Sequence, residues 1–274
     1  MRVAAIILNY KTWQDTLNEV NILKNILDES QDSIIIVDNA SPNESAEILK
    51  KQADKYGYTF IASQNNSGYA AGNNIGLRYA KEKNYKFGWI INNDILILDK
   101  DILEPLLFVL EKDQSVASVN PDVYSPDGHM VNRDSKRFSF WDLTFGMFRY
   151  SKKGRKLSDV GGYGYIYRPQ GCCMILDLDK AEEVGYLDEH TFLYSEEIIY
   201  AERLLKKGYR CACVPTTKII HNHSKTVRSN IDERQIRNIQ KESFRYYLSA
   251  YRKYGILMQQ ICVTFYVFKL KIIG

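Results

Sequence analysis

The sequence contains little proline, few cysteines and no hydrophobic run long enough to cross a bilayer. Six prolines and 45% hydrophobic residues in 274 positions exclude a collagen and a disordered chain. Its five cysteines are an odd number without metal-type spacing, and no Cys-x-x-Cys occurs, which excludes a disulfide-stapled miniprotein. We therefore expect reduced, buried thiols in a cytoplasmic protein with a sizeable core.

An excess of charge is also lacking over most of the chain. The net charge is +4, from 37 basic and 33 acidic residues, which is too small to indicate nucleic-acid binding. Residues 225–274 alone carry ten Lys or Arg against three Asp or Glu, a local charge of +7, so residues 1–224 sum to −3. The basic character belongs to the tail.

Two apolar stretches resemble membrane segments but are too short. Residues 3–8 stop at Asn9 without a small-residue cleavage site, so we expect a buried strand rather than a signal peptide. Residues 256–268 are thirteen positions interrupted by polar side chains, whereas a spanning helix needs about 20.

What the sequence does contain is an alternation of strand and helix patterns. This alternation predicts an α/β fold with a Rossmann-like sheet, in which ligands bind beyond the carboxyl ends of the strands. The expected strands are 3–8, 34–37, 59–62, 87–91, 116–119, 172–176 and 210–214. The expected helices are 16–27, 46–56, 73–84, 101–112, 180–184 and 196–207, with a helical tail from 231.

Polar residues follow the first two expected strands. Asn9 and Tyr10 end the first, and Asp38, Asn39 and Ser41 end the second. A carboxylate at a strand end can accept hydrogen bonds from a nucleobase or a ribose hydroxyl. The alternative is an Asx turn that caps the next helix.

Glycine and asparagine then dominate residues 65–76. Gly68 and Gly72 would let the backbone approach a ligand, and a helix starting near Asn73 would offer free N–H groups. The spacing matches neither a Walker loop nor a dinucleotide fingerprint. An ordinary loop with a helix cap is the alternative.

Carboxylates and one histidine follow later strands. Asp94, after Asn92 and Asn93, could hold Mg²⁺ or Mn²⁺, or could be a turn residue. His221 follows the last strand as a metal ligand, a diphosphate contact or a polar loop residue. Residues 196–197 are two glutamates that open a helix, where the helix dipole favours acids and where one could serve as a base toward a hydroxyl.

The long segment 124–169 shows no sustained periodicity, and a loop of that length is functional or mobile. Its end, residues 161–168, combines tyrosines with Arg168. These side chains suit stacking on sugar rings or pairing with a phosphate. Packing against the tail helix near Tyr251 is the alternative.

Taken together, these blocks resemble the family 2 glycosyltransferases, particularly bacterial rhamnosyltransferase-like and cell-surface polysaccharide enzymes. The resemblance covers about residues 1–226, and the ordered set is more specific than any one block. The matching blocks are Leu8–Tyr10, Val37–Ser41, Asn66–Gly76, Asn92–Asp94, Gly171–Met174, Gly185–Glu189, Glu196–Glu197, Arg203–Leu204, Gly208–Arg210 and His221.

The resemblance implies a GT-A fold, a nucleotide-activated sugar as donor and inversion at the anomeric carbon. Asp94 and His221 would hold a divalent metal, Mn²⁺ or Mg²⁺, on the diphosphate of a UDP- or dTDP-sugar. Glu197 stands where the family usually has an Asp base, so Glu196 and Glu197 could exchange roles, and Ile199 replaces a further Asp. The implied donor-binding residues are Asn9, Tyr10, Asp38, Asn39, Asn66, Gly68, Gly72, Asn73 and Asn93.

We accordingly predict a GT-A domain over 1–226, with a nucleotide-sugar-binding half (1–98) and an acceptor and catalytic half (99–226), followed by a basic amphipathic helical tail (227–274). The expected sheet is mixed and mostly parallel. The expected enzyme is a hexosyl- or rhamnosyltransferase that extends a glycan or lipid-linked acceptor in bacterial surface polysaccharide synthesis. The tail would bring this cytoplasmic enzyme to the inner face of the membrane, or would pack on the body or on a second subunit, as in a homodimer.

Two other functions compete. A sugar-nucleotide-binding subunit without catalysis is favoured by the departures at Glu197 and Ile199. A nucleotidyltransferase would need a glycine-rich loop with a basic residue directly after the first strand, and residues 9–13 lack the glycines.

Overall fold

The computed structural model describes residues 2–148, 157, 159–222 and 232–273. Residues 147–148 and 271–273 are described by their backbone only. Within these residues, nine strands form one mixed sheet. They are β1 (Val3–Asn9), β2 (Ser33–Asp38), β3 (Thr59–Ala62), β4 (Phe87–Ile91), β5 (Ile95–Ile97), β6 (Val116–Tyr124), β7 (Gly164–Ile166), β8 (Cys173–Asp177) and β9 (Arg210–His221).

The strand order is β3-β2-β1-β4-β8-β6-β9-β5, and β7 also pairs with β9. The pairings among β1 to β4 are parallel, as is β6 with β9. The pairings of β8 with β4 and β6, and of β5 and β7 with β9, are antiparallel. The expected α/β fold with a mixed sheet is confirmed, and its parallel part is concentrated in the N-terminal half.

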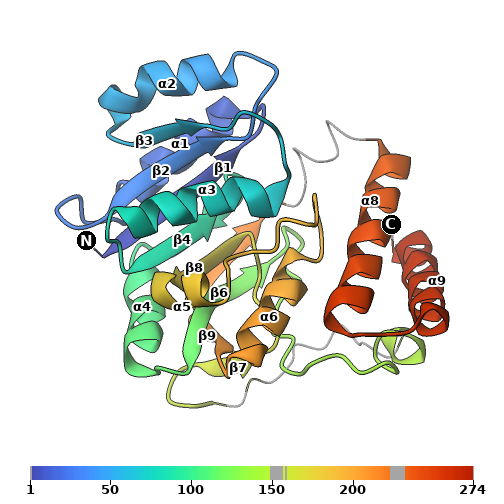
Figure 1. Cartoon of the computed structure of the whole chain (residues 1–274). Helices are drawn as coiled ribbons and strands as arrows, with labels where there is room; N and C mark the ends of the chain where they lie inside the picture. The colour runs from blue at the N-terminus through green and yellow to red at the C-terminus, as the bar shows by residue number, and fades with distance from the viewer. Residues whose placement is uncertain (1, 149–156, 158, 223–231, 274) are drawn as a thin grey trace.

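Helices cover both faces of the sheet (Figure 1). They are α1 (Trp13–Leu23), α2 (Ser45–Tyr56), α3 (Tyr69–Glu82), α4 (Leu103–Lys112), α5 (Leu178–Glu183) and α6 (Glu196–Lys206). Because side chains alternate along a strand, Val3, Ala5 and Ile7 of β1 pack with α1, α2 and α4, whereas Ala4 and Ile6 pack with α3, α5 and α6. The two apolar cores therefore follow from the pleat of the buried strands.

Helix α3 begins four residues earlier than expected. Gly68 precedes it with a φ of +94°, and the Tyr69 backbone N–H donates to the Phe192 carbonyl at 2.9 Å. The expectation that Asn73 lies at the helix start is therefore wrong, because this contact with a distant loop fixes the first turn at Tyr69. Asn73 lies inside the helix.

Two strands run past prolines. Strand β6 continues through Pro121 to Tyr124, and β9 continues beyond Val214 to His221. The register between them shifts after Pro121, and such an irregularity tolerates a residue without an N–H donor. Both strands therefore reach the carboxyl edge of the sheet.

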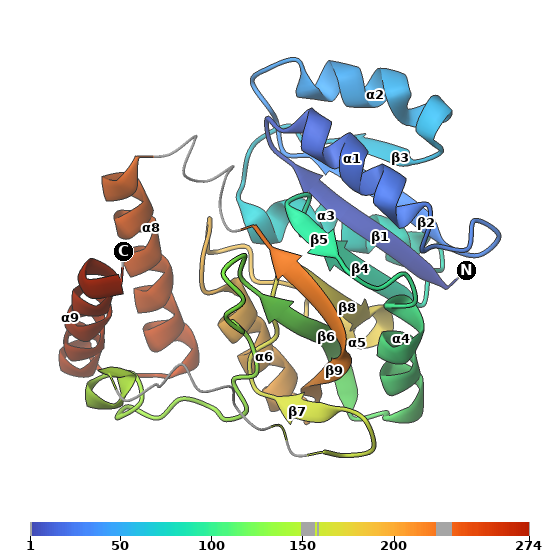
Figure 2. The ribbon, with the colours of Figure 1, turned by 180° about the vertical axis from the view of Figure 1, so that it is seen from behind.

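The described part of the tail is helical and packs on the body. It consists of α8 (Glu233–Tyr246), the π-helical segment η2 (Tyr247–Tyr251) and α9 (Ile256–Ile273). A third apolar cluster joins Tyr247, Leu248 and Cys262 of the tail to Ile198 and Ile199 of α6. Figures 1 and 2 show α8 and α9 side by side, at one side of the molecule. The predicted boundary at residue 226 lies outside the described residues.

Among the described residues, no helix has both the length and the apolar character needed to cross a membrane.

Candidate active site

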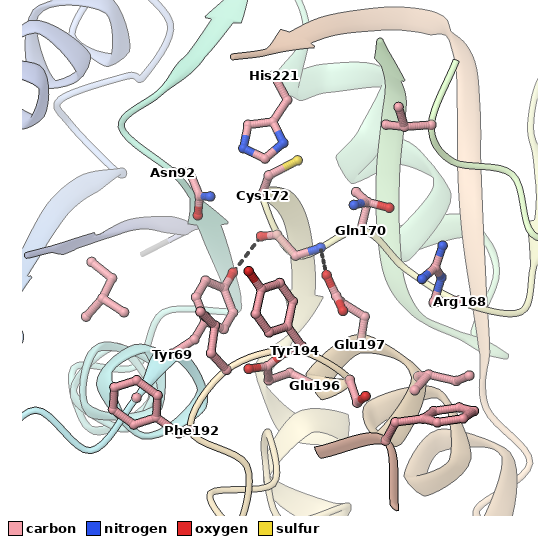
Figure 3. A pocket seen from close by; sticks show the side chains of 18 of the residues that line it. Tyr69, Asn92, Arg168, Gln170, Cys172, Phe192, Tyr194, Glu196, Glu197 and His221 are labelled. Atoms are coloured by element: carbon pink, nitrogen blue, oxygen red, sulfur yellow. Dashed lines mark hydrogen bonds between the residues drawn. The ribbon is translucent and has the colours of Figure 1, made fainter. Parts of the chain in front are cut away.

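A cavity of about 660 Å³ lies between the carboxyl edge of the sheet and the tail (Figure 3). Its walls come from loops after β1, β2, β3 and β4, from the start of α6, from the end of β9 and from the tail. The lining residues used below are Tyr10, Asn39, Asn66, Gly68, Tyr69, Asn93, Asp94, Phe138, Leu143, Arg168, Gly171, Glu196, Glu197, His221, Phe244, Tyr266 and Lys269.

The pairing of β5 with β9 brings Asp94 and His221 together. Ile95 pairs with His221, and the Asn222 backbone N–H donates to the Asp94 carbonyl at 3.0 Å. As a result, His221 Nε2 lies 3.2 Å from Asp94 Oδ1. That carboxylate oxygen is buried, and no donor among the described residues is aligned to hydrogen-bond to it. An acidic oxygen and an imidazole thus face the cavity together.

Hydrogen bonds behind this pair tie β1, β2 and α1 to each other. The side-chain amide of Asn9 makes two of these bonds. Its Nδ2 donates to Asp38 at 2.7 Å, and its Oδ1 accepts from the Thr16 hydroxyl at 2.8 Å. Asp38 also accepts from the Ser41 N–H and hydroxyl, at 2.9 and 2.7 Å, which closes an Asx turn. Neither Asn9 nor Asp38 is among the described residues that line the cavity.

The glycine and asparagine block divides between the cavity and the core. Gly68, at the cavity, has no room for a side chain, because a Cβ atom would lie 2.1 Å from the Phe192 carbonyl oxygen. Gly72 packs on Leu8 instead, where a Cβ would lie 2.5 Å from Cδ1. Asn73 is buried and donates to the Tyr69 carbonyl at 3.0 Å. Asn66 Oδ1 accepts from the Asn39 amide at 3.0 Å at the cavity wall.

Asn93 lies at the cavity and also holds the β4 end in place. Its amide donates to the hydroxyls of Thr12 and Thr16, at 2.9 and 2.8 Å. Together with Tyr10, it occupies the side of the cavity formed by the N-terminal half. Five predicted donor-binding residues therefore line the cavity, whereas four lie outside its described lining: Asn9, Asp38, Gly72 and Asn73.

Glu196 and Glu197 begin α6 directly after two left-handed residues. Tyr194 and Ser195 have φ angles of 70° and 69°, a conformation that costs of order 1–3 kcal/mol for residues other than glycine. Strain of this kind concentrates at functional sites because the surrounding structure must hold it. Here the sharp turn presents the first turn of α6 to the cavity.

Gly171 links Glu197 to Tyr69 across the cavity wall (Figure 3). Its N–H donates to Glu197 Oε1 at 3.3 Å, and its carbonyl accepts from the Tyr69 hydroxyl at 2.7 Å. A Cβ atom at this position would lie 3.1 Å from both side-chain oxygens. The absence of a side chain at Gly171 therefore permits the arrangement.

The two adjacent glutamates have different surroundings. Glu196 is buried, and burial together with the neighbouring charge of Glu197 raises the pKa of Glu196 well above its usual range. Burial therefore favours the neutral form of the Glu196 carboxyl group over its charged form.

The side of the cavity toward the tail contains residues that local motifs do not reveal. Phe244, Tyr266 and Lys269 come from α8 and α9, and they line the cavity with Phe138 and Arg168. Arg168 pairs with Asp134 at 2.8 Å. The sequence predicts no place in the cavity for these tail residues, because only the packing of the tail brings them to the site.

The tyrosines before Arg168 serve packing rather than the cavity. The Tyr163 and Tyr165 hydroxyls both donate to Asp113, at 2.9 and 2.7 Å, and Tyr167 donates to the buried Glu202 at 2.6 Å. Tyr167 also approaches the Tyr247 hydroxyl of η2, at 3.4 Å. The alternative of packing against the tail thus describes Tyr167.

The mixed sheet with a cavity at its carboxyl edge is a GT-A glycosyltransferase fold, which the solved structures described below share. The family model described as Glycosyl transferase family 2 matches residues 5–177. The chain belongs to this family, and it is a glycosyltransferase.

One relative and two solved structures are similar to this chain. The chain is 26% identical over 225 residues to the low-salt glycan biosynthesis hexosyltransferase Agl10 of Haloferax volcanii, covering 80% of this chain and 67% of the relative. It resembles the mannosyltransferase PcManGT of Pyrobaculum calidifontis in complex with GDP-Man and Mn²⁺ (TM-score 0.63, 14% identity, 97% and 69% coverage). It also resembles GalNAc-T7 with UDP, GalNAc and Mn²⁺ (TM-score 0.66, 13% identity, 91% and 48% coverage).

Proposed function

We propose that the chain is a metal-dependent, inverting glycosyltransferase that moves a sugar from a nucleoside-diphosphate sugar to an acceptor hydroxyl. The observation that carries the proposal is one cavity lined by a candidate base, Glu197, and by the Asp94–His221 pair. In Figure 3, His221 and Glu197 stand apart, with Cys172 next to His221 and Tyr194 next to Glu197. A base separated from the leaving group is what in-line displacement requires.

The donor belongs to the N-terminal side of the cavity. Tyr10 and Asn39 suit a nucleoside, because they offer an aromatic ring and an amide beyond the carboxyl ends of β1 and β2. PcManGT with GDP-Man and GalNAc-T7 with UDP support a nucleotide sugar as the donor. We propose a UDP- or dTDP-sugar.

A divalent cation fits the residues present. Asp94 supplies a carboxylate oxygen without an aligned donor, and His221 supplies an imidazole. The described residues contain no cluster of three His, Cys, Asp or Glu side chains for a metal, as is common where Mg²⁺ or Mn²⁺ binds through one or two protein groups and substrate phosphates. When bound, the cation would neutralise charge on the departing diphosphate.

Glu197 is the better base of the two adjacent glutamates. A general base must be ionised to accept a proton, and the burial of Glu196, which raises its pKa, disfavours the ionised form. Glu197 is fixed through Oε1 by the Gly171 N–H. Glu197 would take the acceptor proton as the new C–O bond forms and as the bond from the anomeric carbon to the diphosphate breaks.

The departure at Ile199 does not argue against catalysis. Ile199 is fully buried in the cluster between α6 and the tail. An apolar side chain suits this position because the position packs against the tail rather than facing the cavity.

The acceptor belongs to the side of the cavity toward the tail. Phe138, Tyr266 and Arg168 combine aromatic faces with a cation, which suits a sugar attached to a phosphate. The printed name of the Haloferax relative supports hexosyl transfer in glycan biosynthesis. We propose hexosyl or rhamnosyl transfer to a glycan or lipid-linked acceptor of a surface polysaccharide, at the inner face of the cell membrane.

The test is a donor panel of UDP-, GDP- and dTDP-sugars with a lipid-linked acceptor, with and without Mn²⁺, with product mass as the measurement. Glu197→Gln should lower turnover by about 10²–10⁴-fold, whereas Glu196→Gln should retain most of it. Glu183→Gln, a half-exposed glutamate, is the matched control. Unchanged turnover in Glu197→Gln would contradict the base assignment. Binding of the donor by the wild type without hydrolysis or transfer would favour a non-catalytic subunit.

A further inference from the structure

An exposed apolar surface lies on the side of the molecule formed by the tail. We call it the outer apolar surface, and it combines α9 with the 3-10 turn η1 (Phe145–Phe148) and the segment before it. Its large side chains are each more than one third exposed: Trp141, Phe145, Ile256, Leu257, Met258 and Phe268. Exposed apolar side chains that are grouped on a protein surface mark interaction sites.

Ring contacts join the two segments into one surface. The Trp141 and Phe145 rings lie 5.2 Å apart, and Phe145 meets Phe265 of α9 edge-on at 4.7 Å. Figures 1 and 2 both show the yellow-green turn η1 beside the lower part of α9. The surface is therefore assembled from parts of the chain that are far apart in sequence.

Helix α9 holds this surface in a fixed relation to the cavity. Its buried residues Cys262 and Val263 pack in the cluster between the tail and α6. Tyr266 and Lys269 of the same helix line the cavity, whereas Phe268 is exposed. One helix thus forms a wall of the cavity and part of the outer apolar surface.

The charge along α9 is basic. Helix α9 contains no Asp or Glu, and the exposed Lys253 lies shortly before it. Lysines and arginines attract anionic lipid headgroups by about 1 kcal/mol each near the surface. Tryptophan and phenylalanine bind at the boundary between headgroups and acyl chains.

We propose that the outer apolar surface docks on an anionic membrane surface, with Trp141, Phe145 and Phe268 at headgroup level. This inference extends the proposed function, since docking would bring the cavity to lipid-linked acceptors. The test measures membrane binding and not turnover, so the membrane proposal and the proposed function can fail separately.

The experiment is sedimentation of the full chain with vesicles of phosphatidylcholine, with and without phosphatidylglycerol. We expect binding to the anionic vesicles that is about tenfold stronger than to neutral ones. The variant Trp141→Ser, Phe145→Ser, Phe268→Ser should lose about tenfold or more of this binding. The matched control is the triple variant Leu98→Ser, Phe108→Ser, Leu205→Ser. Its three positions are 44–56% exposed, and the three positions of the test variant are 52–54% exposed. The control should bind like the wild type.

A second measurement locates the contact. Brominated lipids in the anionic vesicles should quench tryptophan fluorescence, and Trp141→Phe should remove that quenching. Of the other two tryptophans, Trp89 is fully buried and Trp13 lies on α1, away from α9 (Figures 1 and 2). Circular dichroism and UDP binding verify that each variant is folded. Equal binding by test and control variants would overturn the proposal. A second outcome would also overturn it: sedimentation velocity shows that the wild type is a dimer, the test variant is a monomer, and neither the wild type nor the test variant binds vesicles.

Discussion

Gly171 is the residue at which the cavity wall depends on a missing side chain. Glu197 and Tyr69 reach its backbone from opposite directions, and both side-chain oxygens would be 3.1 Å from a Cβ atom. That separation is tighter than ordinary van der Waals contact, so one of the two side chains would have to move.

Replacing Gly171 with Ala should therefore impair catalysis more than folding. A shift of a few tenths of an ångström in Glu197 should lower kcat by about tenfold or more, because misplacing a catalytic group by about 1 Å can cost about 10²-fold. The thermal midpoint should change little. Gly255→Ala is the control, since a Cβ there meets nothing within 4 Å. Equal kcat values for both variants would contradict the role assigned to Gly171.

Glu19 provides a second residue-level prediction, on pH. Burial, and then the charge of Asp94, raises the pKa of Glu19 from 4.5 to about 8. The folded chain keeps a proton that the unfolded chain releases above pH 4.5, so this group lowers stability as pH rises toward 8. The loss is about 1.4 kcal/mol per pH unit.

Glu19→Gln should remove this dependence. Between about pH 5 and pH 7.5, the variant should gain about 3 kcal/mol in unfolding free energy relative to the wild type. Urea unfolding at several pH values, in EDTA to exclude metal, measures the difference. A constant difference across that range would show that Glu19 is not the titrating group.

Sequence alone locates the blocks of the site better than the direction of each side chain. Asp94 and His221, which follow strands, come to one cavity with Glu197, which begins a helix. Asp38 and Asn73 belong to sequence blocks that also reach the cavity, but these two residues are buried and make internal hydrogen bonds. The motif pattern contains no signal for that difference, which is decided by packing. The donor roles of these residues stay predictions.

At the scale of elements, strand β5 is what makes the Asp94–His221 pair. It has three residues, and its partner β9 lies far along the chain. An apolar run of three residues is too short to be identified as a strand from its periodicity. The sequence therefore predicts Asp94 and His221 as site residues but does not predict their contact. Strands β1 to β4 are apolar runs, and helices α2, α4 and α6 carry apolar residues at helical spacing, so all of them occur close to where expected.

Asp188 joins the tail helices to the body. It accepts hydrogen bonds from the Tyr246 and Tyr251 hydroxyls, at 2.9 and 2.5 Å, and pairs with Arg203 of α6 at 3.1 Å. Burial alone would raise its pKa, but the hydrogen bonds from Tyr251 and His190 and the charge of Arg203 hold the pKa well below its usual range. The ionised form therefore stabilises the fold at neutral pH.

Asp188→Asn should lower the unfolding free energy by about 3 kcal/mol at neutral pH, because it leaves Arg203 without its buried partner. The loss should shrink as pH falls below about 4, where the wild-type carboxylate of the unfolded chain is protonated. Limited proteolysis should also release residues 232–273 sooner. Glu233→Gln, in an exposed pair with Arg237, should show neither effect. A variant as resistant as the wild type would mean that the apolar cluster alone holds the tail.

At the scale of the whole molecule, ligands that bridge the two halves should stabilise the fold. A nucleotide at 100 times its Kd adds about 2.7 kcal/mol, or about 5–10 °C in Tm for a chain of this size. We expect UDP to raise the Tm further in the presence of Mn²⁺ than in EDTA.

Asp94→Ala should abolish the part of this rise that depends on Mn²⁺. Asp127→Ala is the matched control, because Asp127 also pairs with a histidine, His129 at 3.4 Å, but on the exposed surface. Scanning calorimetry with UDP, Mn²⁺ and EDTA measures the effect. A Mn²⁺-dependent rise that persists in Asp94→Ala would place the metal elsewhere.

The insertion of β8 between β4 and β6 has a consequence for synthesis on the ribosome. Strand β4 is buried along its whole length, and it pairs with β8 through Phe87–Asp177 to Ile91–Cys173. Until residue 177 has emerged, the nascent N-terminal half presents an unprotected apolar edge, which is the kind of edge that aggregates or recruits chaperones. The N-terminal half therefore cannot mature ahead of the C-terminal half, and the cavity between them forms only after both have been translated.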